Sequence, residues 1–140
     1  MSEERDPPAH TSARPPARPP TVGLDLLEIA RLERALERHP GLARRVFTEG
    51  ELAYAAARAR PGMHLAARFC AKEAVGKALG MAAWELRDIE VVSPAGGGAP
   101  EIALHGPVAA RARELGGAVR ISLTHTDEQA GAVAIIDRDG

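Results

Sequence analysis

Apolar and polar residues follow a regular spacing along the chain from residue 21 onward. Over residues 21–27 the apolar side chains fall at every second position, which predicts a β-strand. The next apolar residues, Ile29, Leu32 and Leu36, recur at helical spacing, and His39-Pro40-Gly41 predicts the end of that helix. The chain is therefore expected to open with a strand that leads directly into an amphipathic helix.

Two more helices are predicted before the middle of the chain. Thr48-Glu49-Gly50-Glu51 matches a capping box, in which the Thr48 hydroxyl accepts from the Glu51 backbone N–H and the Glu51 carboxylate reaches back. This box begins a helix that should end at Pro61-Gly62. The third and longest helix is predicted over residues 63–79, with Gly80 as its C-terminal stop.

The second half of the chain is predicted to mix strands with one helix. Its elements are a strand at 88–92, a turn at 96–98, a strand at 101–104, a helix at 107–115, and two strands around 119–123 and 132–136 joined by a hairpin loop at 126–129. The order is strand, three helices, two strands, helix, two strands. That order predicts an α+β fold, with helices packed on a mostly antiparallel sheet.

Composition divides the chain into a tail and one domain. Six of the 11 prolines lie within residues 1–20, which contain almost no large apolar side chain, so this tail is predicted to be disordered. Residues 21–140 are long enough to form one domain with a real core. Because hydrophobic residues make up 45% of the chain but aromatic residues only 3%, that core must consist of Leu, Val, Ile and Ala.

Charge and composition also argue against several classes of function. A net charge of −1 gives no basic footprint for duplex nucleic acid, and the few aromatic residues argue against a stacking platform for single strands. One cysteine excludes an internal disulfide framework. No apolar run approaches the ~18 residues of a membrane span. We therefore expect a cytoplasmic protein that binds neither nucleic acid nor a membrane.

Candidate chemistry concentrates in residues 68–77, which read Arg-Phe-Cys-Ala-Lys-Glu-Ala-Val-Gly-Lys. Glu73 lies there between Lys72 and Lys77 on a predicted helix. The opening strand contributes one further acid, Asp25, among apolar neighbours where an unpaired charge would be costly. Two carboxylates and a lysine, if brought together, suit Mg²⁺ and a phosphate, because Mg²⁺ takes few protein ligands and keeps several waters.

Each of these residues also has a simpler interpretation. On a helical wheel the polar residues of 68–77 spread over about half of the circumference, and the other half must face the core. Glu73 and Lys77 could then form a surface pair that contributes ~0.2–0.5 kcal/mol. Asp25 could face solvent or cap the next helix. Gly76 weakens the surface-helix interpretation, since a mid-helix glycine costs roughly 0.5–1 kcal/mol and is tolerable where something approaches the backbone closely.

Two other regions carry candidate functional residues. Residues 122–126, Ser-Leu-Thr-His-Thr, close a strand with hydroxyls and an imidazole, which suit a phosphate or an adenine edge but are also typical of a polar hairpin. Between residues 31 and 60, seven arginines and four glutamates form a local basic excess. That excess suits an acidic protein partner, or it is an ordinary charged helix face. Cys70 is interpreted as a small buried hydrophobe.

Six segments together resemble the small 4′-phosphopantetheinyl transferases of the holo-acyl-carrier-protein synthase type, in order and spacing as well as in residue type. They are Gly-Leu-Asp-Leu-Leu-Glu-Ile at 23–29, Val-Phe-Thr-Glu-Gly-Glu-Leu at 46–52, Arg-Phe-Cys-Ala-Lys-Glu-Ala at 68–74, Gly-Lys-Ala-Leu-Gly at 76–80, Asp-Ile-Glu-Val at 88–91 and Ser-Leu-Thr-His-Thr at 122–126. The resemblance implies the fold of that family for the domain at 21–140. It also implies transfer of the 4′-phosphopantetheine group from coenzyme A to a serine of an apo acyl carrier protein, with release of adenosine 3′,5′-bisphosphate.

The resemblance implies roles for particular residues. The catalytic group would be Asp25, Glu73 and Lys77, in which the two acids bind Mg²⁺ against the coenzyme A pyrophosphate, Lys77 holds the phosphates, and Glu73 is the nearest base for the carrier serine. The implied coenzyme A contacts are Arg68, Lys77, Gly80, Pro100, His125 and Thr126. The implied carrier-protein contacts are Arg31, Arg38 and Arg45. The family is also commonly homotrimeric, with each site shared between neighbouring subunits.

Three alternatives stay open at this point. A transferase of the same family could act on a polyketide or other secondary-metabolite carrier instead of the fatty-acid one. A non-catalytic module could bind coenzyme A or a carrier protein, although binding alone would not require Asp25, Glu73 and Lys77 together. A different metal-dependent phosphate-ester enzyme would leave the arginine-rich helix unexplained.

Overall fold

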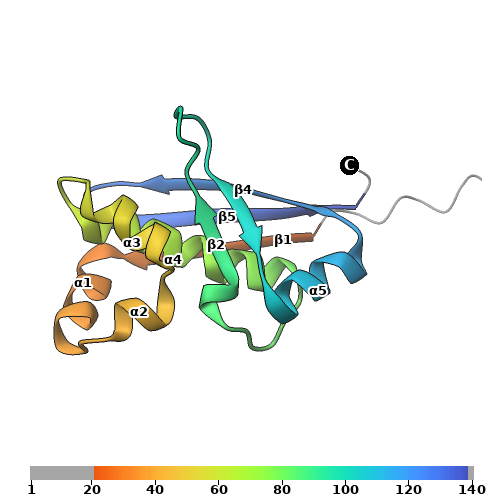
Figure 1. The fold of residues 1–140 in the computed structure, drawn as a ribbon, viewed down its shortest axis with the longest axis horizontal. Helices are drawn as coiled ribbons and strands as arrows, with labels where there is room; N and C mark the ends of the chain where they lie inside the picture. Colours follow the sequence, from red (N-terminus) through yellow and green to blue (C-terminus); the bar gives the residue numbers. More distant parts are fainter. Residues whose placement is uncertain (1–20, 139–140) are drawn as a thin grey trace, which may run out of the picture.

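The computed structural model describes residues 21–138, so the predicted proline-rich tail at 1–20 lies outside the described residues. The elements are β1 (Thr21–Glu28), α1 (Ile29–Arg38), α2 (Leu42–Val46), α3 (Glu49–Ala56), α4 (Pro61–Ala78), the 3₁₀ turn η1 (Leu86–Asp88), β2 (Ile89–Val92), β3 (Glu101–Leu104), α5 (Gly106–Leu115), β4 (Ala118–His125) and β5 (Gln129–Asp137). Every strand pairing is antiparallel, which confirms the predicted α+β class (Figure 1).

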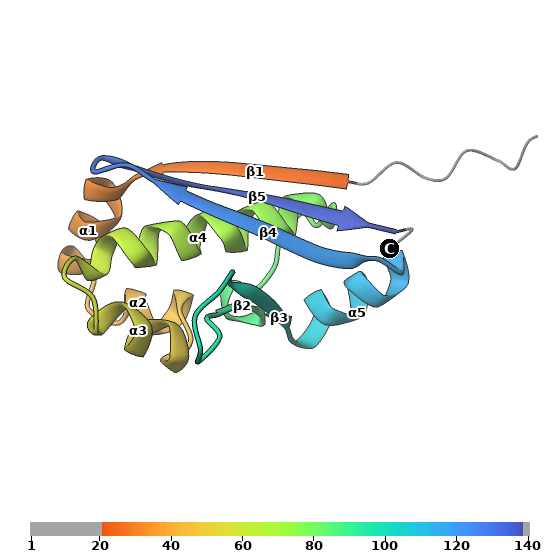
Figure 2. The same cartoon turned by 90° about the horizontal axis from the view of Figure 1, so that it is seen from above.

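The long helix α4 lies between two layers. A three-stranded sheet with the order β1-β5-β4 covers one side of it, and α3 with the separate two-stranded sheet β2-β3 lies on the other (Figure 2). Because β5 is central, β1 and β4 are the two edges of the larger sheet. Side chains on opposite sides of α4 can therefore lie near opposite edges of this sheet, one at β1 and the other at β4.

Small residues let α4 pack closely on the larger sheet. Ala71 and Ala74 of the helix and Ala132 and Ala134 of β5 are buried in this contact layer. At Gly23, a Cβ atom would overlap the carbonyl oxygen of Ala74, so β1 can cross the helix there only without a side chain. The crossing directs every second residue of β1 toward α4.

On its other side α4 accepts an aromatic ring at Gly76. A Cβ atom at this position would overlap the indole ring of Trp84, which comes from the connection between α4 and η1. The prediction that something approaches the helix backbone at Gly76 is therefore correct. The approaching group is the chain's own Trp84, and the glycine is explained by packing.

The structure changes several details of the predicted elements. Helix α3 ends at Ala56, before the predicted stop at Pro61-Gly62. Helix α4 begins at Pro61, two residues earlier than predicted, because proline suits the first turn, where the backbone N–H needs no partner. The short helix α2 follows Gly41, whose φ of 94° reverses the chain, and the apolar pattern did not predict it. The strands form two sheets and not one. The capping box at Thr48 and Glu51 is present as predicted.

The apolar positions of β1 face away from α4. Val22, Leu24 and Leu26 are 59%, 60% and 64% exposed, whereas Gly23 is buried and Asp25 half-buried on the helix side. The predicted alternation is present, but within one chain its apolar residues face outward and Gly23 and Asp25 face the core. An exposed apolar strip on an edge strand is typical of a surface that another protein surface covers.

Among the described residues, no helix has the length and apolar character that a membrane crossing requires.

Candidate active site

Asp25, Glu73 and Lys77 meet where β1 crosses α4. The ammonium of Lys77 lies 3.2 Å from Asp25 Oδ1 and donates a hydrogen bond to the carbonyl oxygen of Leu24 at 3.1 Å. Glu73 lies one helical turn before Lys77, on the same side of α4. Asp25 does not cap α1, whose N-cap is Glu28. The fold therefore brings the three predicted catalytic residues into one cluster.

The charge balance of this cluster favours a bound cation. Burial first, and then the negative charge of Asp25, raise the pKa of Glu73 above its ordinary value, although Lys77 opposes the shift. The positive charge of Lys77 therefore does not fully offset the repulsion between Asp25 and Glu73. A bound cation would reduce that repulsion further. Within residues 21–138, no group of three or more metal-binding side chains gathers. Two carboxylates completed by water and substrate oxygens suit Mg²⁺.

Cys70 is buried next to the cluster, and its thiol is unreactive. Its side chain is fully buried, with Sγ 3.6 Å from the carbonyl oxygen of Ala130. Burial, followed by the charge of Asp25, raises the pKa of the Cys70 thiol to about 12. Because the thiolate is the reactive form, this cysteine packs as a small hydrophobe, in agreement with the interpretation from sequence.

Arg68 leaves α4 on the side opposite to the cluster. Arg68 and Lys77 are separated by a rotation of about 180° around the helix. Arg68 is 3% exposed, and its guanidinium donates to Ser93 Oγ at 2.9 Å and to the carbonyl oxygen of His64 at 3.4 Å. Within the described part of the chain, its Nε has no hydrogen-bond partner.

The environment of Arg68 suits an anionic ligand. Burial is the largest effect on Arg68 and lowers the pKa of its guanidinium. In the part of the chain that the structure describes, no carboxylate forms an ion pair with it. A buried charge without a paired opposite charge is costly, and a bound anion would offset that cost.

Arg68 lines a pocket of about 410 Å³ whose lining contains no carboxylate. The ring of Tyr54 lies between two guanidinium groups, 4.1 Å from that of Arg58 and 3.9 Å from that of Arg68. Residues of the β2–β3 loop, including Pro100, form another wall, and His125 lines the side nearest β4. Two guanidinium groups and no lining acid make this pocket suitable for phosphate groups.

Among the residues of this pocket that were missed in the sequence are Tyr54, Arg58 and His64. His64 precedes Arg68 by one helical turn, and this spacing is a signal that could have identified it. Tyr54 and Arg58 belong to α3 and the residues after it, and only the packing of that helix on α4 brings them to Arg68. No pattern along the chain indicates that meeting.

The pocket holds two imidazole rings close together. The ring centroids of His64 and His125 are 6.1 Å apart. Burial, followed by the positive charges of Arg68, His125 and Arg58, lowers the pKa of His64. The environment of the pocket therefore favours the neutral form of His64.

Thr126 and Gly80, like Lys77, are predicted contacts with coenzyme A that lie outside this lining. The hydroxyl oxygen of Thr126 accepts hydrogen bonds from the backbone N–H groups of Gln129 at 3.0 Å and Glu128 at 3.3 Å, so it shapes the hairpin turn beside the pocket. Gly80 ends α4 with a φ of 68°, as predicted, on the side of Lys77. Pro100, by contrast, lines the pocket directly.

The assignment of Lys72 to the half of the helix that faces away from the core is wrong. Lys72 is fully buried and pairs with Glu51, with 2.7 Å between Nζ and Oε1. The half of the α4 wheel that carries polar residues is also not a plain surface, because the second layer buries Arg68, Lys72 and Gly76. Periodicity along one helix cannot reveal a second layer that packs on its polar side.

The predicted carrier contacts form an exposed basic surface. Arg31 and Arg38 are exposed and lie on one face of α1, since seven residues correspond to about two helical turns. Arg45 is exposed in the last turn of α2. The three guanidinium groups therefore belong to two neighbouring helices of the same layer.

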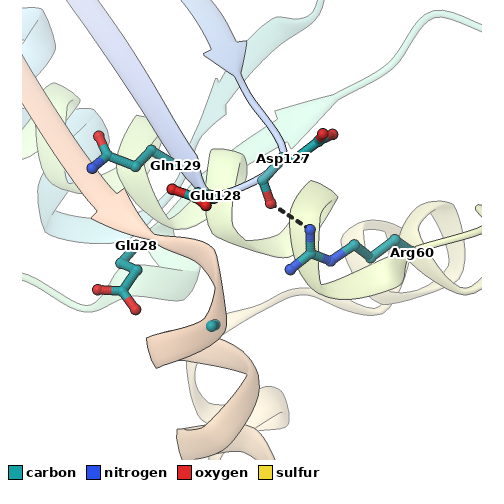
Figure 3. A pocket seen from close by; sticks show the side chains of 6 residues that line it. Glu28, Arg60, Asp127, Glu128 and Gln129 are labelled. Atoms are coloured by element: carbon teal, nitrogen blue, oxygen red, sulfur yellow. Dashed lines mark hydrogen bonds between the residues drawn. The ribbon is translucent and has the colours of Figure 1, made fainter.

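A recess at the β4–β5 hairpin suits an anion poorly. Glu28, Asp127 and Glu128 line it around Arg60 (Figure 3). The guanidinium of Arg60 already donates to Glu33 Oε1 at 2.7 Å and to the carbonyl oxygen of Asp127 at 2.6 Å. Arg60 thus ties the start of α4 to α1 and to the hairpin.

Comparison with known proteins identifies the family. Residues 21–134 match the 4′-phosphopantetheinyl transferase superfamily, and the chain belongs to it. The chain is 50% identical over 121 residues to a holo-[acyl-carrier-protein] synthase of Moorella thermoacetica, a match that covers 83% of this chain and 92% of that protein. It is 48% identical over 118 residues to a holo-[acyl-carrier-protein] synthase of Streptomyces coelicolor, with 83% and 95% covered.

Solved structures agree with this assignment. The Chronobacterium ammoniagenes ACPS–CoA complex superposes with a TM-score of 0.73 at 30% identity, covering 85% of this chain and 97% of that one. A Bacillus anthracis holo-(acyl-carrier-protein) synthase in complex with CoA (3′,5′-ADP) has a TM-score of 0.66 at 28% identity, with 83% and 94% covered. The fold and family implied by the six sequence segments are thereby confirmed.

Proposed function

We propose that this protein transfers the 4′-phosphopantetheine group from coenzyme A to a serine of an apo acyl carrier protein and releases adenosine 3′,5′-bisphosphate. The observation that carries the proposal is the cluster of Asp25, Glu73 and Lys77 at the crossing of β1 and α4. Its relatives named as holo-[acyl-carrier-protein] synthases, and the solved neighbour bound to coenzyme A, support the same reaction.

In this proposal Asp25 and Glu73 hold a Mg²⁺ ion, which when bound supplies positive charge to the pyrophosphate and to the leaving phosphate. Lys77 contributes a second positive charge to a phosphate oxygen. Its ammonium is held by Asp25 and by the Leu24 carbonyl, so it is oriented before substrate arrives. Preorganised charge of this kind is effective in phosphoryl-type transfer, where charge shifts to the leaving oxygen.

Glu73 is also proposed as the base for the carrier serine. A carboxylate within reach of the serine hydroxyl can accept its proton as the serine oxygen attacks. The serine oxygen forms a bond to the phosphorus of the phosphopantetheine group. The bond from that phosphorus to the oxygen of the adenosine 5′-phosphate breaks, and the nucleotide leaves with the electron pair.

The pocket around Arg68 is proposed to bind the nucleotide end of coenzyme A, with a phosphate group near Arg68. Two guanidinium groups and the absence of a lining carboxylate support this assignment. His125 and Pro100 would contact the nucleotide from the two walls of the pocket. Thr126 and Gly80 stay predicted contacts, at the hairpin and at the end of α4.

A homotrimer is proposed because one chain offers the two half-sites on opposite sides of α4. The Asp25 cluster lies at the β1 edge of the larger sheet, and His125 lies at the β4 edge. A neighbouring copy could bring its Arg68 pocket beside this chain's Asp25 cluster. The exposed strip of Val22, Leu24 and Leu26 is the kind of apolar surface that such a contact buries.

The carrier protein is proposed to dock on Arg31, Arg38 and Arg45, whose exposed guanidinium groups suit an acidic helix. A carrier docked there would present its serine to Glu73, because α1 directly follows β1. The proposed reaction takes place in the cytoplasm, where coenzyme A and a carrier protein meet.

Intact mass measurement tests the reaction directly. The protein is incubated with coenzyme A, Mg²⁺ and apo carriers of both the fatty-acid and the polyketide type. A mass increase of one phosphopantetheine group on the carrier is expected, and omission of Mg²⁺ should abolish it. Failure to modify any carrier, in a protein that is folded, would reject the proposal.

Sedimentation tests the assembly separately. Leu24→Glu places a charge in the exposed strip without touching the core. We expect the variant to be a folded monomer that has lost transfer activity. A wild-type protein that sediments as an active monomer would reject the shared site.

A further inference from the structure

A buried ion pair in this protein has no place in the chemistry described above. Glu51 of α3 and Lys72 of α4 are both 0% exposed, with 2.7 Å between Nζ and Oε1. Removing two charges from water is costly, and a well-packed apolar pair is often as stable. The ion pair therefore calls for an explanation beyond stability, and its hydrogen bonds supply one.

Every polar atom of the pair has a partner. The ammonium of Lys72 donates to Glu51 and to the backbone carbonyl oxygens of Leu86, at 3.0 Å, and of Ile89. These bonds use all three of its donors. The Glu51 carboxylate also accepts from the backbone N–H of Thr48 at 2.9 Å and of Val91 at 2.9 Å. The pair thus joins α3, α4, η1 and β2 at one point.

The strand fixed in this way carries a wall of the nucleotide pocket. Ser93 follows Val91 by two residues, and Ser93 Oγ accepts the 2.9 Å hydrogen bond from Arg68. The loop that continues from Ser93 to Pro100 lines the same pocket. Arg68 lies one helical turn from Lys72 on the same side of α4. Lys72 and Arg68 therefore hold β2 at two neighbouring points.

A second hydrogen bond ties the same strand to α3. Thr48 Oγ1 donates to Glu90 Oε2 at 2.6 Å while it accepts from the backbone N–H of Glu51 at 3.3 Å. The capping box of α3 is thus part of the attachment of β2. Thr48 and Glu51 thus both cap α3 and hold β2, the strand that leads into the pocket wall.

We propose that Lys72 and Glu51 are positioning residues of the coenzyme A pocket, which hold β2 at the distance from α4 at which Ser93 engages Arg68. Neither side chain touches the substrate. The inference rests on the proposed binding of coenzyme A at Arg68. It assigns Lys72 to the shape of the pocket and leaves phosphate binding to Lys77.

The test must separate positioning from stability. Lys72→Met alone leaves the Glu51 carboxylate buried without a counter-charge, and such a protein can fail to fold. The double variant Lys72→Met with Glu51→Gln removes both charges and keeps the side-chain volumes. Loss of the link from α4 to Leu86 and Ile89 should raise the KM and the Kd for coenzyme A by about tenfold, with kcat changed less than about threefold.

Val108→Ala in α5 is the matched control, because it truncates a fully buried side chain that is not among those lining this pocket. It should lower stability and leave the KM for coenzyme A unchanged. Calorimetry gives the Kd for coenzyme A, and urea unfolding gives stability, for all three proteins. A double variant with wild-type KM and Kd, or an equal rise in Val108→Ala, overturns the positioning role.

The same measurements distinguish failure of this inference from failure of the proposed function. If the wild-type protein does not bind coenzyme A, the assignment of the pocket fails, and the positioning role fails with it. If the wild-type binds and the double variant binds equally well, only the positioning role fails.

Discussion

Helix α4 carries two lysine–carboxylate pairs, five residues apart, in opposite environments. Lys72 and Glu51 are fully buried and every polar atom of the pair is bonded. Lys77 is 51% exposed, lies 3.2 Å from Asp25 and has a second carboxylate, Glu73, beside it. A saturated pair has no donor or acceptor left for a ligand, whereas the open pair has both. The same two residue types therefore position a strand at one site and offer binding groups at the other.

The largest expected effect comes from removing one acid of the open cluster. Glu73→Gln keeps the side-chain shape but removes the charge proposed to hold Mg²⁺, so transfer should fall by about 10³-fold or more. Stability should not decrease, because the raised pKa of Glu73 means that folding already disfavours its charged form. Intact mass analysis of the carrier and thermal melting measure the two quantities. Near-normal turnover with Mg²⁺ would reject the role of Glu73.

Matched lysine substitutions test the contrast itself. Lys72→Met should cost about 3–5 kcal/mol of stability, since it leaves a buried carboxylate unpaired. Lys77→Met should cost less than about 1 kcal/mol, because its pair with Asp25 is half-exposed and screened by solvent. Transfer should fall by about 10²-fold in Lys77→Met. Urea unfolding measures the stability of both variants, and single-turnover experiments measure their transfer rates. An equal loss of stability in the two variants would contradict the comparison.

Charge reversal on α1 should have a smaller effect, confined to the carrier. Arg38 is exposed and belongs to neither lysine pair, so Arg38→Glu should weaken carrier binding by about tenfold. Affinity for coenzyme A and thermal stability should stay unchanged. Surface plasmon resonance with immobilised apo carrier, with calorimetry for coenzyme A, measures both. Equal loss of both affinities would argue against a docking surface on α1.

The smallest expected effect is a proton linkage on the Arg68 side. The pKa of His64 is lowered by burial and by Arg68, His125 and Arg58, so the unfolded chain binds a proton at His64 more readily than the folded one. Stability therefore falls as pH decreases below the unfolded value of about 6.5. His64→Gln should flatten this slope between pH 7 and 5. An unchanged slope in urea unfolding at several pH values would contradict the shift.

Local signals in the sequence predicted most elements. The capping box at Thr48 and Glu51 and the stop at Gly80 involve residues within one helical turn, and both are present. The inward faces of β4 and β5, such as Ile121 opposite Ala134, follow the predicted alternation. Helix α2 was missed because five residues are too few to establish a period.

The candidate site was predicted in part. Asp25, Glu73 and Lys77 were selected together because family resemblance linked two segments that pattern alone could not connect, and the structure brings them together. Tyr54 and Arg58 were missed because their function depends on how α3 packs against α4. Lys72 was misinterpreted because its charge suggested exposure, and the Glu51 that neutralises it lies in another helix.

The sequence by itself determined the periods of the helices and strands, the family, and the acids and lysine of the cluster. Only the tertiary structure decided which faces those elements bury: the outward apolar strip of β1, the inward Lys72, and the placement of Lys77 and Arg68 on opposite sides of α4. The physical reason is that periodicity depends on neighbours within a turn or a strand. Burial and charge pairing depend on partners that are distant in the chain and meet only when the layers pack.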